Sequence, residues 1–456
     1  MPDLTLHDLR YDVAIIGGGI LGASVAYFLS SISKSRTVLV EQEKSAGFHT
    51  SSRNSGKVHA PFLYDPSKKR FFAKAAFLGF KMWKEYCEQK SLPFVQDGVI
   101  EVATSDCGID RLNNYLAWGV ANGLEENKDF WLLDKNQIKK IEPNVDCKSA
   151  ILCVKDASVN YGLNTKSLIQ DSQSLGCKIL LGSKVMRIST HEIKGQGIRL
   201  LMRSGNNDHT ITTQYLINTA GGNAVDIAHS LGMAKLYSDL HFRGEYWQAP
   251  AEYFNLTKRS IYSVPKFPEY PFLDPHWIVR IDGGREVGPN AVPTFGPYAY
   301  SWMENAKNLI PKVIESIKAK GTYRILLDRK FLTLLGHEAR SSLSKTVMIN
   351  RVKKFLPQLK ASKFVHRGTA GIRSLVVGPE GRFVPDTMVV KSDHSMHILN
   401  YNSPGATGAL PMGAAIVSDL LQNGIIQKDS IEMGRIKKPI WDFKQISSQM
   451  QLEEIR

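Results

Sequence analysis

The stretch Tyr11-Asp12-Val13-Ala14-Ile15-Ile16-Gly17-Gly18-Gly19-Ile20-Leu21-Gly22 decides the fold of this chain. Its first half is a short apolar run, typical of a buried β-strand, and three glycines at G-x-G-x-x-G spacing follow. Gly17 permits a tight turn, Gly19 lets a pyrophosphate approach the backbone, and Gly22 lets the next helix lie close to the strand. The start of that helix offers N–H groups and a partial positive charge. The stretch therefore predicts a dinucleotide site.

The residues that follow support this prediction. Residues 23–29 have a helical pattern, Thr37 to Val40 indicates a second strand, and Glu41 follows that strand. Such an acid, about 20 residues after the glycines, accepts a ribose 2′-hydroxyl. A lone glycine motif is weak evidence, because glycine turns are common, but here strand, helix, second strand and acid agree. The acid favours NAD or FAD over NADP, and the motif leaves the choice between those two open.

The composition is that of a globular protein. The chain has 456 residues, enough for two or three domains, with 43% hydrophobic and 22% charged residues. Its formal charge of +15 could attract acidic metabolites, an anionic membrane surface or nucleic acid. Because the lysines and arginines are scattered, we favour a basic surface suited to acidic metabolites and expect no nucleic-acid partner.

The cysteines and the N-terminal residues bear on the compartment. The five cysteines form no C-x-x-C pair and no spacing suited to a metal, so we expect no metal site and a reducing compartment. Residues 1–10 show no signal pattern, and the first apolar run is interrupted by glycines. We therefore expect a cytoplasmic protein without a membrane span, and peripheral contact with a membrane stays open.

Patterns along the chain predict a discontinuous fold. Val95 to Thr104 alternates about Gly98 and predicts two paired strands, while Ile198–Arg203 and His209–Thr213 predict an antiparallel pair. Residues 215–222 predict another buried strand that ends in glycines and returns the chain to the nucleotide sheet. Helices are expected at residues 71–89, 110–122, 164–175, 302–319 and 345–355.

We therefore predict an α/β fold, α+β overall, with a Rossmann-like nucleotide-binding domain and an inserted antiparallel-sheet substrate domain. The nucleotide-binding domain is expected to comprise residues 1–90, 151–238 and 365–425. The substrate domain is expected to comprise residues 91–150 and 239–364, and residues 426–456 are expected to form a C-terminal tail.

Four further stretches extend the pattern. They are Asn54–His59, His241–Tyr246, Phe272–Trp277 leading through Arg280 to Gly288-Pro289-Asn290, and Gly371-Ile372-Arg373 followed by Asn400–Gly408. Together with the glycine stretch, and from about Tyr11 to Leu421, the sequence resembles the FAD-dependent D-amino-acid-oxidase-like superfamily. Within it, the chain is most similar to the L-2-hydroxyglutarate dehydrogenase/oxidase branch. The second and third stretches are specific to that branch, whereas the glycine motif and Gly-Ile-Arg mark only the superfamily.

The resemblance implies FAD as cofactor and an L-2-hydroxy acid as substrate. The expected reaction is oxidation of L-2-hydroxyglutarate to 2-oxoglutarate by hydride transfer to flavin N5. The chain departs from the family at Ile278, where a threonine is usual, and at Gly405, where an alanine is usual. Both departures lie near the expected flavin and substrate, so the exact substrate stays open.

Five residues are candidates for the chemistry. Arg373 is the first candidate to bind the substrate carboxylate, because a guanidinium binds a carboxylate bidentately. Arg243 and Arg280 are candidates for the distal carboxylate of a dicarboxylic acid, although a structural ion pair would explain each equally well. His276 and His59 are candidates for the base, since imidazole titrates near working pH. A histidine is often only a packing residue, and His59 could instead lie against the flavin.

The expected FAD contacts come from the glycine motif, the second strand, the loop after it and later glycine-rich turns. They are Gly17, Gly19, Ile20, Leu21, Gly22, Glu41, Gln42, Ser51, Ser52, Asn54, Ser55, Val185, Ala220, Gly221, Gly371, Gly405, Ala406, Thr407 and Gly408. Backbone N–H groups of residues 405–408 would stabilise negative charge on the reduced flavin. A plain glycine-rich helix start would explain the same four residues.

Other functions stay in competition. An amine or amino-acid oxidase, resembling glycine and sarcosine oxidases, would keep the same fold. An RNA-associated flavoprotein, prompted by the charge of +15, would show RNA affinity that falls with salt, but no aromatic-basic recognition module is visible. A binding module that never turns over is a weaker alternative. The electron acceptor, oxygen or a quinone, covalent attachment of FAD and the oligomeric state stay open.

Overall fold

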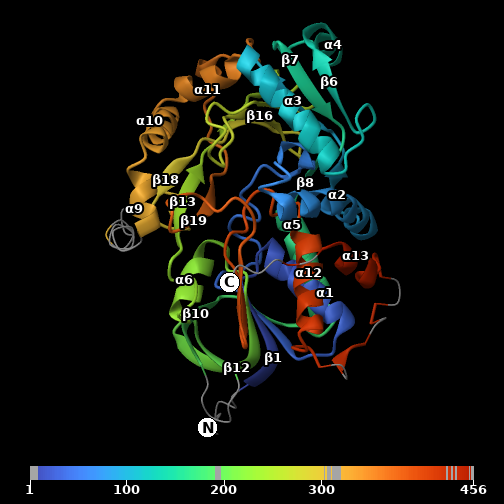
Figure 1. Cartoon of the computed structure of the whole chain (residues 1–456), viewed down its shortest axis with the longest axis vertical. Coiled ribbons are helices and arrows are strands. Elements are labelled where there is room, and N and C mark those ends of the chain that lie inside the picture. The colour runs from blue at the N-terminus through green and yellow to red at the C-terminus, as the bar shows by residue number, and fades with distance from the viewer. Residues whose placement is uncertain are drawn as a thin grey trace. The chain divides into compact units, whose positions relative to one another are not determined.

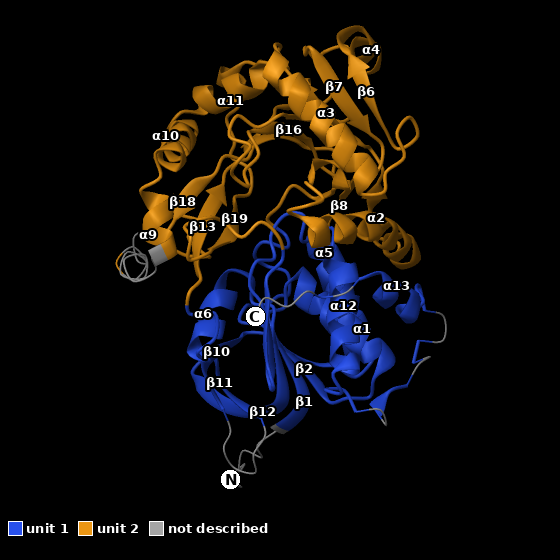
Figure 2. Cartoon of the chain, viewed as in Figure 1, with its two compact units in different colours: residues 1–52, 161–235, 387–456 blue, residues 53–160, 236–386 orange. Residues whose placement is uncertain are grey.

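The computed structural model divides the chain into two compact units, coloured separately in Figure 2. Unit 1 is drawn from residues 1–52, 161–235 and 387–456, and unit 2 from residues 53–160 and 236–386. The structure describes residues 9–190, 197–301, 303, 305, 310, 320–427, 430–432, 435–436, 439–450 and 452. The predicted helix over residues 302–319 lies almost entirely outside these residues.

The discontinuous order resembles the predicted one, but the boundaries differ. Residues 53–90, 151–160, 236–238 and 365–386, predicted to join the nucleotide-binding domain, belong to unit 2. The reason is strand pairing across long sequence separations. Strand β3 (Lys57–Val58) pairs with β8 (Ala157–Val159), and β13 (Ser238–Gly244) pairs with β19 (Gly371–Val377). Such pairings are invisible in local composition.

Unit 1 is built on one large sheet (Figure 1). Strand β1 (Leu9–Ile16) lies between β12 (Asn207–Asn218) and β2 (Thr37–Val40), parallel to both. Ile15 faces Ile217 on one side and Leu39 on the other. All four residues of β2 are buried, as an apolar run in a parallel sheet requires. The outer strands are β9 (Lys178–Leu180), β10 (Ser183–Thr190), β11 (Ile198–Ser204), β20 (Val389–Ser392) and β21 (Ser395–Ile398).

The return of residues 215–218 to the nucleotide sheet is confirmed, because β12 pairs in parallel with β1. The predicted antiparallel partner of Ile198–Arg203 is also confirmed. The prediction that 209–213 and 215–218 are separate strands was wrong, since both belong to β12. A single long strand continues from the hairpin with β11 into the parallel part of the sheet, because its two halves pair with different neighbours.

Helices in unit 1 include α1 (Ile20–Ile32), α5 (Tyr161–Ser174), α6 (Ala224–Ser230) and α12 (Ala409–Gln422). Helix α1 packs against both α5 and α12. Gly413 allows the close approach of α12, because a Cβ there would lie 2.8 Å from the Ser24 backbone. The predicted tail includes a short helix, α13 (Phe443–Gln449), and the rings of Trp441 and Phe443 pack on Phe28. This part of the chain therefore belongs to the core of unit 1.

Unit 2 contains a seven-stranded sheet with a core on each face. Its order is β14 (Trp247–Gln248), β17 (Arg285–Gly288), β16 (His276–Val279), β15 (Ser260–Ser263), β5 (Val99–Ala103), β7 (Ser149–Cys153) and β6 (Phe130–Asp134). Alternate residues of β5 point to opposite faces. Helix α11 (Lys345–Lys353) supplies apolar side chains to one core and α3 (Asp106–Ala121) to the other.

Two three-stranded sheets complete unit 2. One joins β3, β8 and β4 (Phe94–Val95), and the other joins β18 (Val292–Thr294), β13 and β19. The predicted pairing of two strands about Gly98 was wrong, because β4 pairs with β8 while β5 pairs with β15 and β7. Further helices are α2 (Arg70–Lys90), α4 (Lys135–Ile141), α9 (Lys320–Leu326) and α10 (Arg329–Leu343).

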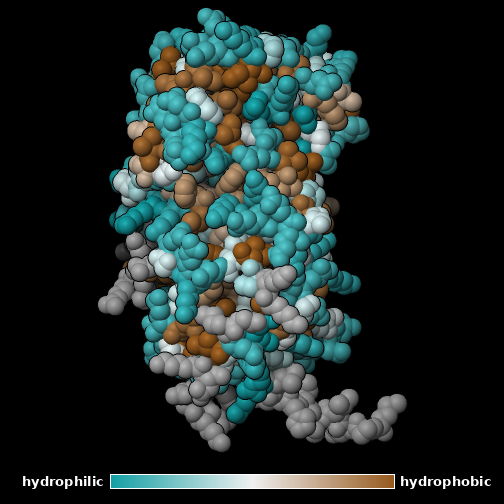
Figure 3. Space-filling view, turned by 90° about the vertical axis from the view of Figure 1, so that its right-hand side faces the viewer, coloured by the Kyte–Doolittle hydropathy of each residue, from teal (hydrophilic) through white to brown (hydrophobic). Residues whose placement is uncertain are grey.

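The surface drawn in Figure 3 is mainly hydrophilic, with smaller hydrophobic areas between. Among the described residues, no helix is long and apolar enough to cross a membrane. All five cysteines are free thiols, and only Cys107 is exposed. Within the same described residues, no three histidine, cysteine or acidic side chains gather as they would to hold a metal ion.

Candidate active site

The glycine motif in unit 1 is required by the backbone around it. Gly17 has a φ of +105°, and a Cβ there would lie 2.6 Å from the carbonyl oxygen of Thr219. A Cβ on Gly22 would lie 1.9 Å from the carbonyl oxygen of Gly17. No side chain fits at either position without moving the backbone, so these two glycines form the turn and the close helix contact.

The start of α1 suits an anion. Gly19 caps the helix without a side-chain hydrogen bond, and the first turn holds no acidic residue. The Ser51 hydroxyl accepts a hydrogen bond of 2.9 Å from the amide of Ile20, and a Cβ on Gly19 would meet only that hydroxyl, at 3.2 Å. The backbone at Gly19 is thus open to close approach, with the positive end of the helix dipole behind it. These residues fit the pyrophosphate of a dinucleotide.

Glu41 braces the turn. Its side chain is buried, and one carboxylate oxygen accepts a hydrogen bond of 2.6 Å from the Gly18 amide. The other oxygen accepts one of 2.8 Å from the amide of Glu43. Burial raises the pKa of the Glu41 carboxyl, and these backbone amides oppose the rise. The acid predicted to bind a ribose therefore also holds the glycine loop in place.

The remaining predicted FAD residues of unit 1 have varied surroundings. Thr219, before Ala220 and Gly221, donates a hydrogen bond of 2.9 Å to the carbonyl of Ile16, which places the end of β12 beside the glycine turn. Gly221 has a φ of +57° and open space where a Cβ would lie. Thr407 lies before the uncapped start of α12 at Gly408, and its hydroxyl lies 3.2 Å from that of Tyr161.

The other predicted FAD residues of unit 1 have contacts that say less about nucleotide binding. Val185 is half-buried at a bulge in β10, and the Gln42 amide lies 3.4 Å from Glu43. Ser52 is exposed, and its hydroxyl donates to the carbonyl of Phe48. Leu21 is buried in the first turn of α1, whereas Ala406 precedes α12. Gly405 is tightly packed, because a Cβ there would lie 2.5 Å from the Asn402 carbonyl oxygen.

Three predicted FAD residues, Asn54, Ser55 and Gly371, lie in unit 2. The Asn54 side chain accepts a hydrogen bond of 2.8 Å from the Gly56 amide, and its backbone carbonyl accepts one from Arg280. A Cβ on Gly371 would lie 1.9 Å from the carbonyl oxygen of Arg53. Contacts within unit 2 therefore account for the glycine at position 371.

The two arginines predicted to bind the distal carboxylate already have acidic partners. Arg243 is buried, with one nitrogen 2.9 Å from the Glu245 carboxylate and another 3.2 Å from the carbonyl of Ala299. The Arg280 Nε donates to Glu286 over 2.7 Å. Both arginines therefore have the structural ion pairs that the sequence left as an alternative.

Arg373 differs from both. It lies in β19, and its Nη1 donates a hydrogen bond of 2.6 Å to the carbonyl of Pro271. Among the residues that the structure describes, its guanidinium has no acidic partner. Burial lowers the pKa of Arg373, and the hydroxyls of Tyr246 and Tyr64 act in the opposite direction. A desolvated cation without a counter-ion is a ready site for a carboxylate.

The two candidate histidines both lie near Tyr262, also in unit 2. The His276 ring lies 3.9 Å from the Tyr262 ring, centroid to centroid, and the His59 ring lies 6.0 Å from it. The Nδ1 of His276 lies 2.9 Å from the Asp274 carbonyl oxygen, which can only accept, so Nδ1 carries the proton. Burial is the main cause that lowers the pKa of His276, to about 3.

His59, in contrast, lies beside an acidic side chain. Its Nδ1 lies 3.3 Å from the carboxylate of Asp156, and that side chain is 1% exposed. A buried carboxylate behind an imidazole orients the ring and stabilises its protonated form. The structure thus brings His59, His276 and Tyr262 together, and it gives only His59 a carboxylate partner.

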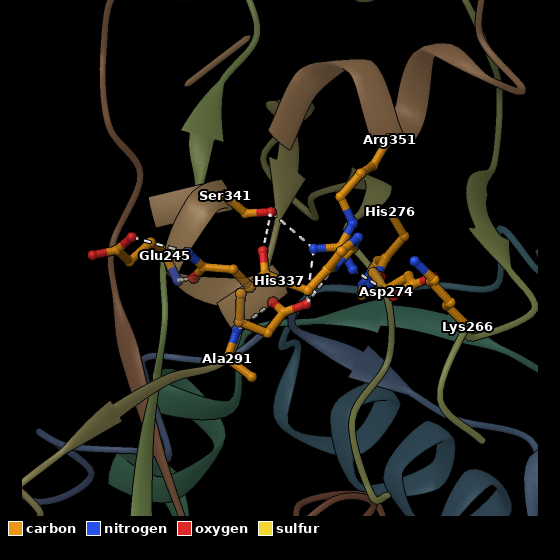
Figure 4. A network of polar contacts seen from close by, with 10 residues as sticks. Glu245, Lys266, Asp274, His276, Ala291, His337, Ser341 and Arg351 are labelled. Atoms are coloured by element: carbon orange, nitrogen blue, oxygen red, sulfur yellow. Dashed lines mark hydrogen bonds and ion pairs between the residues drawn. The ribbon is translucent and has the colours of Figure 1, made fainter. Parts of the chain in front are cut away.

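A polar network fixes the segment before His276 (Figure 4). Arg351 of α11 donates to Asp274 and, over 2.8 Å, to Glu338 of α10. Glu338 also accepts a hydrogen bond of 2.9 Å from the Ala291 amide. Sequence reasoning missed this network, as it missed Asp156 and Tyr262, because Arg351, Glu338, Asp156 and Tyr262 lie outside the stretches that carried the resemblance.

Comparisons with known proteins show the family to which the chain belongs. Residues 12–419 match the family described as FAD dependent oxidoreductase. L-2-hydroxyglutarate dehydrogenase of Escherichia coli K12 is 31% identical over 409 residues, which cover 90% of this chain and 92% of that protein. The mitochondrial L-2-hydroxyglutarate dehydrogenase of Homo sapiens is 28% identical over 425 residues, covering 90% and 89% of the two chains.

Solved structures confirm the predicted fold class. L-α-glycerophosphate oxidase from Mycoplasma pneumoniae, determined with FAD bound, has a TM-score of 0.69 at 20% identity and covers 91% of this chain and 95% of its own. Glycine oxidase from Geobacillus kaustophilus has a TM-score of 0.65 at 16% identity, with coverage of 91% and 95%. At such identities the likeness shows the fold alone.

Proposed function

Because this chain belongs to the FAD-dependent oxidoreductase family, we propose that it oxidises the C2 hydroxyl of L-2-hydroxyglutarate and releases 2-oxoglutarate. Family membership resolves the choice between NAD and FAD that the glycine motif left open. When bound, FAD supplies the hydride acceptor, and the protein supplies binding, orientation and proton transfer. The substrate is that of the relatives named L-2-hydroxyglutarate dehydrogenase, at up to 31% identity.

Arg373 carries this proposal. Its guanidinium is desolvated, and a carbonyl oxygen is its hydrogen-bond acceptor among the described residues. A carboxylate can accept two parallel hydrogen bonds from such a planar group, which fixes orientation as well as position. We assign the C1 carboxylate of the substrate to Arg373, because holding this group next to C2 restricts the reacting carbon most directly.

His59 is the better candidate for the base. The hydroxyl proton passes to its Nε2 as the hydride leaves C2, so the ring becomes positively charged. The Asp156 carboxylate, 3.3 Å from Nδ1, stabilises that charge. Burial, by contrast, disfavours a charged His276, whose pKa is lowered to about 3. We assign His276 an orienting role, in which its unprotonated Nε2 accepts a hydrogen bond.

Anaerobic reduction tests the proposed function. The purified FAD-bound protein is mixed, without oxygen, with L-2-hydroxyglutarate, D-2-hydroxyglutarate, glycine or sarcosine, and flavin absorbance is followed. We expect bleaching by L-2-hydroxyglutarate and formation of 2-oxoglutarate, detected by mass spectrometry. Bleaching by an amino acid but not by the hydroxy acid would instead support the amine-oxidase alternative.

The electron acceptor is the remaining part of the proposal. The reduced flavoprotein passes its electrons to oxygen or to a quinone, and the second acceptor would bring the protein to a membrane surface. Reoxidation rates with dissolved oxygen and with a soluble quinone analogue separate the two. A dehydrogenase that uses a quinone reoxidises slowly in air and quickly with the analogue.

A further inference from the structure

Lys69, like Arg373, is a half-buried cation that has no carboxylate partner among the described residues. It lies directly before α2, and its ammonium nitrogen lies 5.7 Å from the centroid of the buried Tyr64 ring. Among the described residues, that ammonium forms no hydrogen bond and no ion pair. Burial is the main cause that lowers the pKa of Lys69, to about 8, and the charge of Arg373 is the next. Both residues are half-buried, and the positive charge of Arg373 acts on Lys69.

The two acids near Lys69 accept hydrogen bonds from other groups. Asp65 accepts hydrogen bonds from the Ser67 amide, at 2.9 Å, and the Ser67 hydroxyl, at 2.6 Å. Asp386 caps the start of α2, where its two oxygens accept from the amides of Phe71 and Phe72 at 2.8 and 3.1 Å. Both carboxylates act to raise the pKa of Lys69 but leave its ammonium without direct contact.

Four other cations of unit 2, whose side chains are at most 18% exposed, differ from Lys69 and Arg373 in this respect. Each of them has a carboxylate within ion-pair distance: Lys57 with Asp97 at 2.6 Å, Arg243 with Glu245 at 2.9 Å, Arg280 with Glu286, and Arg351 with Glu338 at 2.8 Å. Holding two unpaired cations together costs free energy unless an anion enters between them.

We propose that Lys69 and Arg373 together form a site for a dicarboxylate, in which Arg373 binds the C1 carboxylate and Lys69 binds the C5 carboxylate. The proposal rests on the proposed function for the choice of substrate, but the site itself is a statement about dicarboxylate binding. It replaces Arg243 and Arg280 as candidates for the distal carboxylate. Lys69 then selects L-2-hydroxyglutarate against 2-hydroxy acids of similar length that end in a methyl group.

Calorimetric titration of the FAD-bound protein with glutarate and with butyrate tests the site without turnover. Glutarate carries both carboxylates and cannot be oxidised at C2, whereas butyrate carries one. We expect wild-type protein to bind glutarate more tightly than butyrate. Lys69→Met should weaken glutarate binding by about tenfold to a hundredfold, the loss of one charge-assisted hydrogen bond, and leave butyrate binding unchanged.

Matched variants control for folding. Lys68→Met removes the neighbouring, 72% exposed lysine and should leave both affinities unchanged. Lys69→Arg should restore most of the affinity for glutarate. Lys69→Met should not lower the melting temperature, because it removes an unpaired cation. Lys69→Met that binds glutarate as tightly as wild type would overturn the proposal, and so would wild type that binds glutarate no better than butyrate.

The same experiment separates the two proposals. Lys69-dependent binding of glutarate in a protein that L-2-hydroxyglutarate does not reduce would leave the dicarboxylate site standing and overturn the proposed function. Reduction by L-2-hydroxyglutarate with a Michaelis constant that is unchanged in Lys69→Met would do the reverse.

Discussion

The proposed nucleotide cradle of unit 1 and the proposed catalytic cluster of unit 2 are built in opposite ways. The cradle, defined by Gly17, Gly19, Gly22, Glu41 and Ser51, lies within 35 consecutive residues and works through backbone groups. The catalytic cluster, defined by His59, Lys69, Asp156, His276 and Arg373, spans more than 300 residues and works through side chains. Backbone chemistry leaves a local sequence signature, whereas side-chain chemistry depends on which strands meet.

The largest expected effect comes from replacing His59, the proposed base. His59→Gln should lower the rate of flavin reduction by about 10²- to 10⁴-fold, because the hydroxyl proton loses its acceptor. FAD content should stay at the wild-type level, since the cradle is unchanged. Stopped-flow absorbance under anaerobic conditions measures both. A larger loss in His276→Gln than in His59→Gln would reverse the roles assigned to the two rings.

A smaller effect is expected from replacing Asp156, the carboxylate beside His59. Asp156→Asn keeps the volume of the side chain but removes the charge 3.3 Å from His59, so the imidazolium is less stable. We expect reduction to slow by about tenfold to a hundredfold, with FAD content and the melting temperature at the wild-type level. Slower reduction accompanied by a lower melting temperature or a loss of FAD would instead indicate a structural role.

A substitution in the cradle should cause loss of FAD, whereas a substitution in the cluster should slow flavin reduction. Gly22→Ala places a Cβ 1.9 Å from the Gly17 carbonyl oxygen, so the turn must move, and we expect loss of FAD together with about 2 kcal/mol of stability. Gly336→Ala is the matched control, because a Cβ on this residue of α10 would meet nothing within 4 Å. Urea unfolding and flavin absorbance measure the two losses. Full FAD content in Gly22→Ala would refute the role given to this glycine.

This contrast explains what the sequence could and could not predict. The strand, the turn, Glu41 and the return of β12 follow from apolar runs, glycine spacing and one acid, all of which are local. The ion pairs of the candidate arginines are harder to predict, even where the acid lies nearby in the sequence. Arg243 and Arg280 pair with Glu245 and Glu286, two and six residues further along the chain. Arg373, in β19, has no acidic partner among the described residues, and nothing in the sequence around it indicates this difference.

Lys69 shows the same limit more strongly. It lies in a stretch of lysines and arginines, and nothing in that stretch distinguishes a half-buried lysine from its exposed neighbour Lys68. The wrong pairing predicted about Gly98 has a related cause. The turn was recognised, but β5 finds its partners in β7 and β15, about 50 and 160 residues away.

The smallest expected effect is a dependence of protein stability on pH, which arises from Glu101. Glu101 of β5 is fully buried, in register with Tyr262, and burial raises its pKa to about 8. The folded protein therefore holds a proton that the unfolded chain releases near pH 4.5. Wild-type stability should fall between about pH 4.5 and 8, by at most about 1.4 kcal/mol per pH unit. Glu101→Gln should lack this slope in urea unfolding, and an equal slope in both proteins would contradict the assignment.

The central claim is that the cradle holds FAD while Arg373 aligns the hydroxy acid for oxidation. The most direct test is anaerobic reduction of wild type and Arg373→Met by L-2-hydroxyglutarate, with FAD content measured in the same samples. We predict full FAD content in both proteins, rapid bleaching of wild type with one 2-oxoglutarate formed per flavin, and bleaching of the variant at least about a hundredfold slower. A fully loaded Arg373→Met protein that L-2-hydroxyglutarate bleaches at the wild-type rate would contradict it.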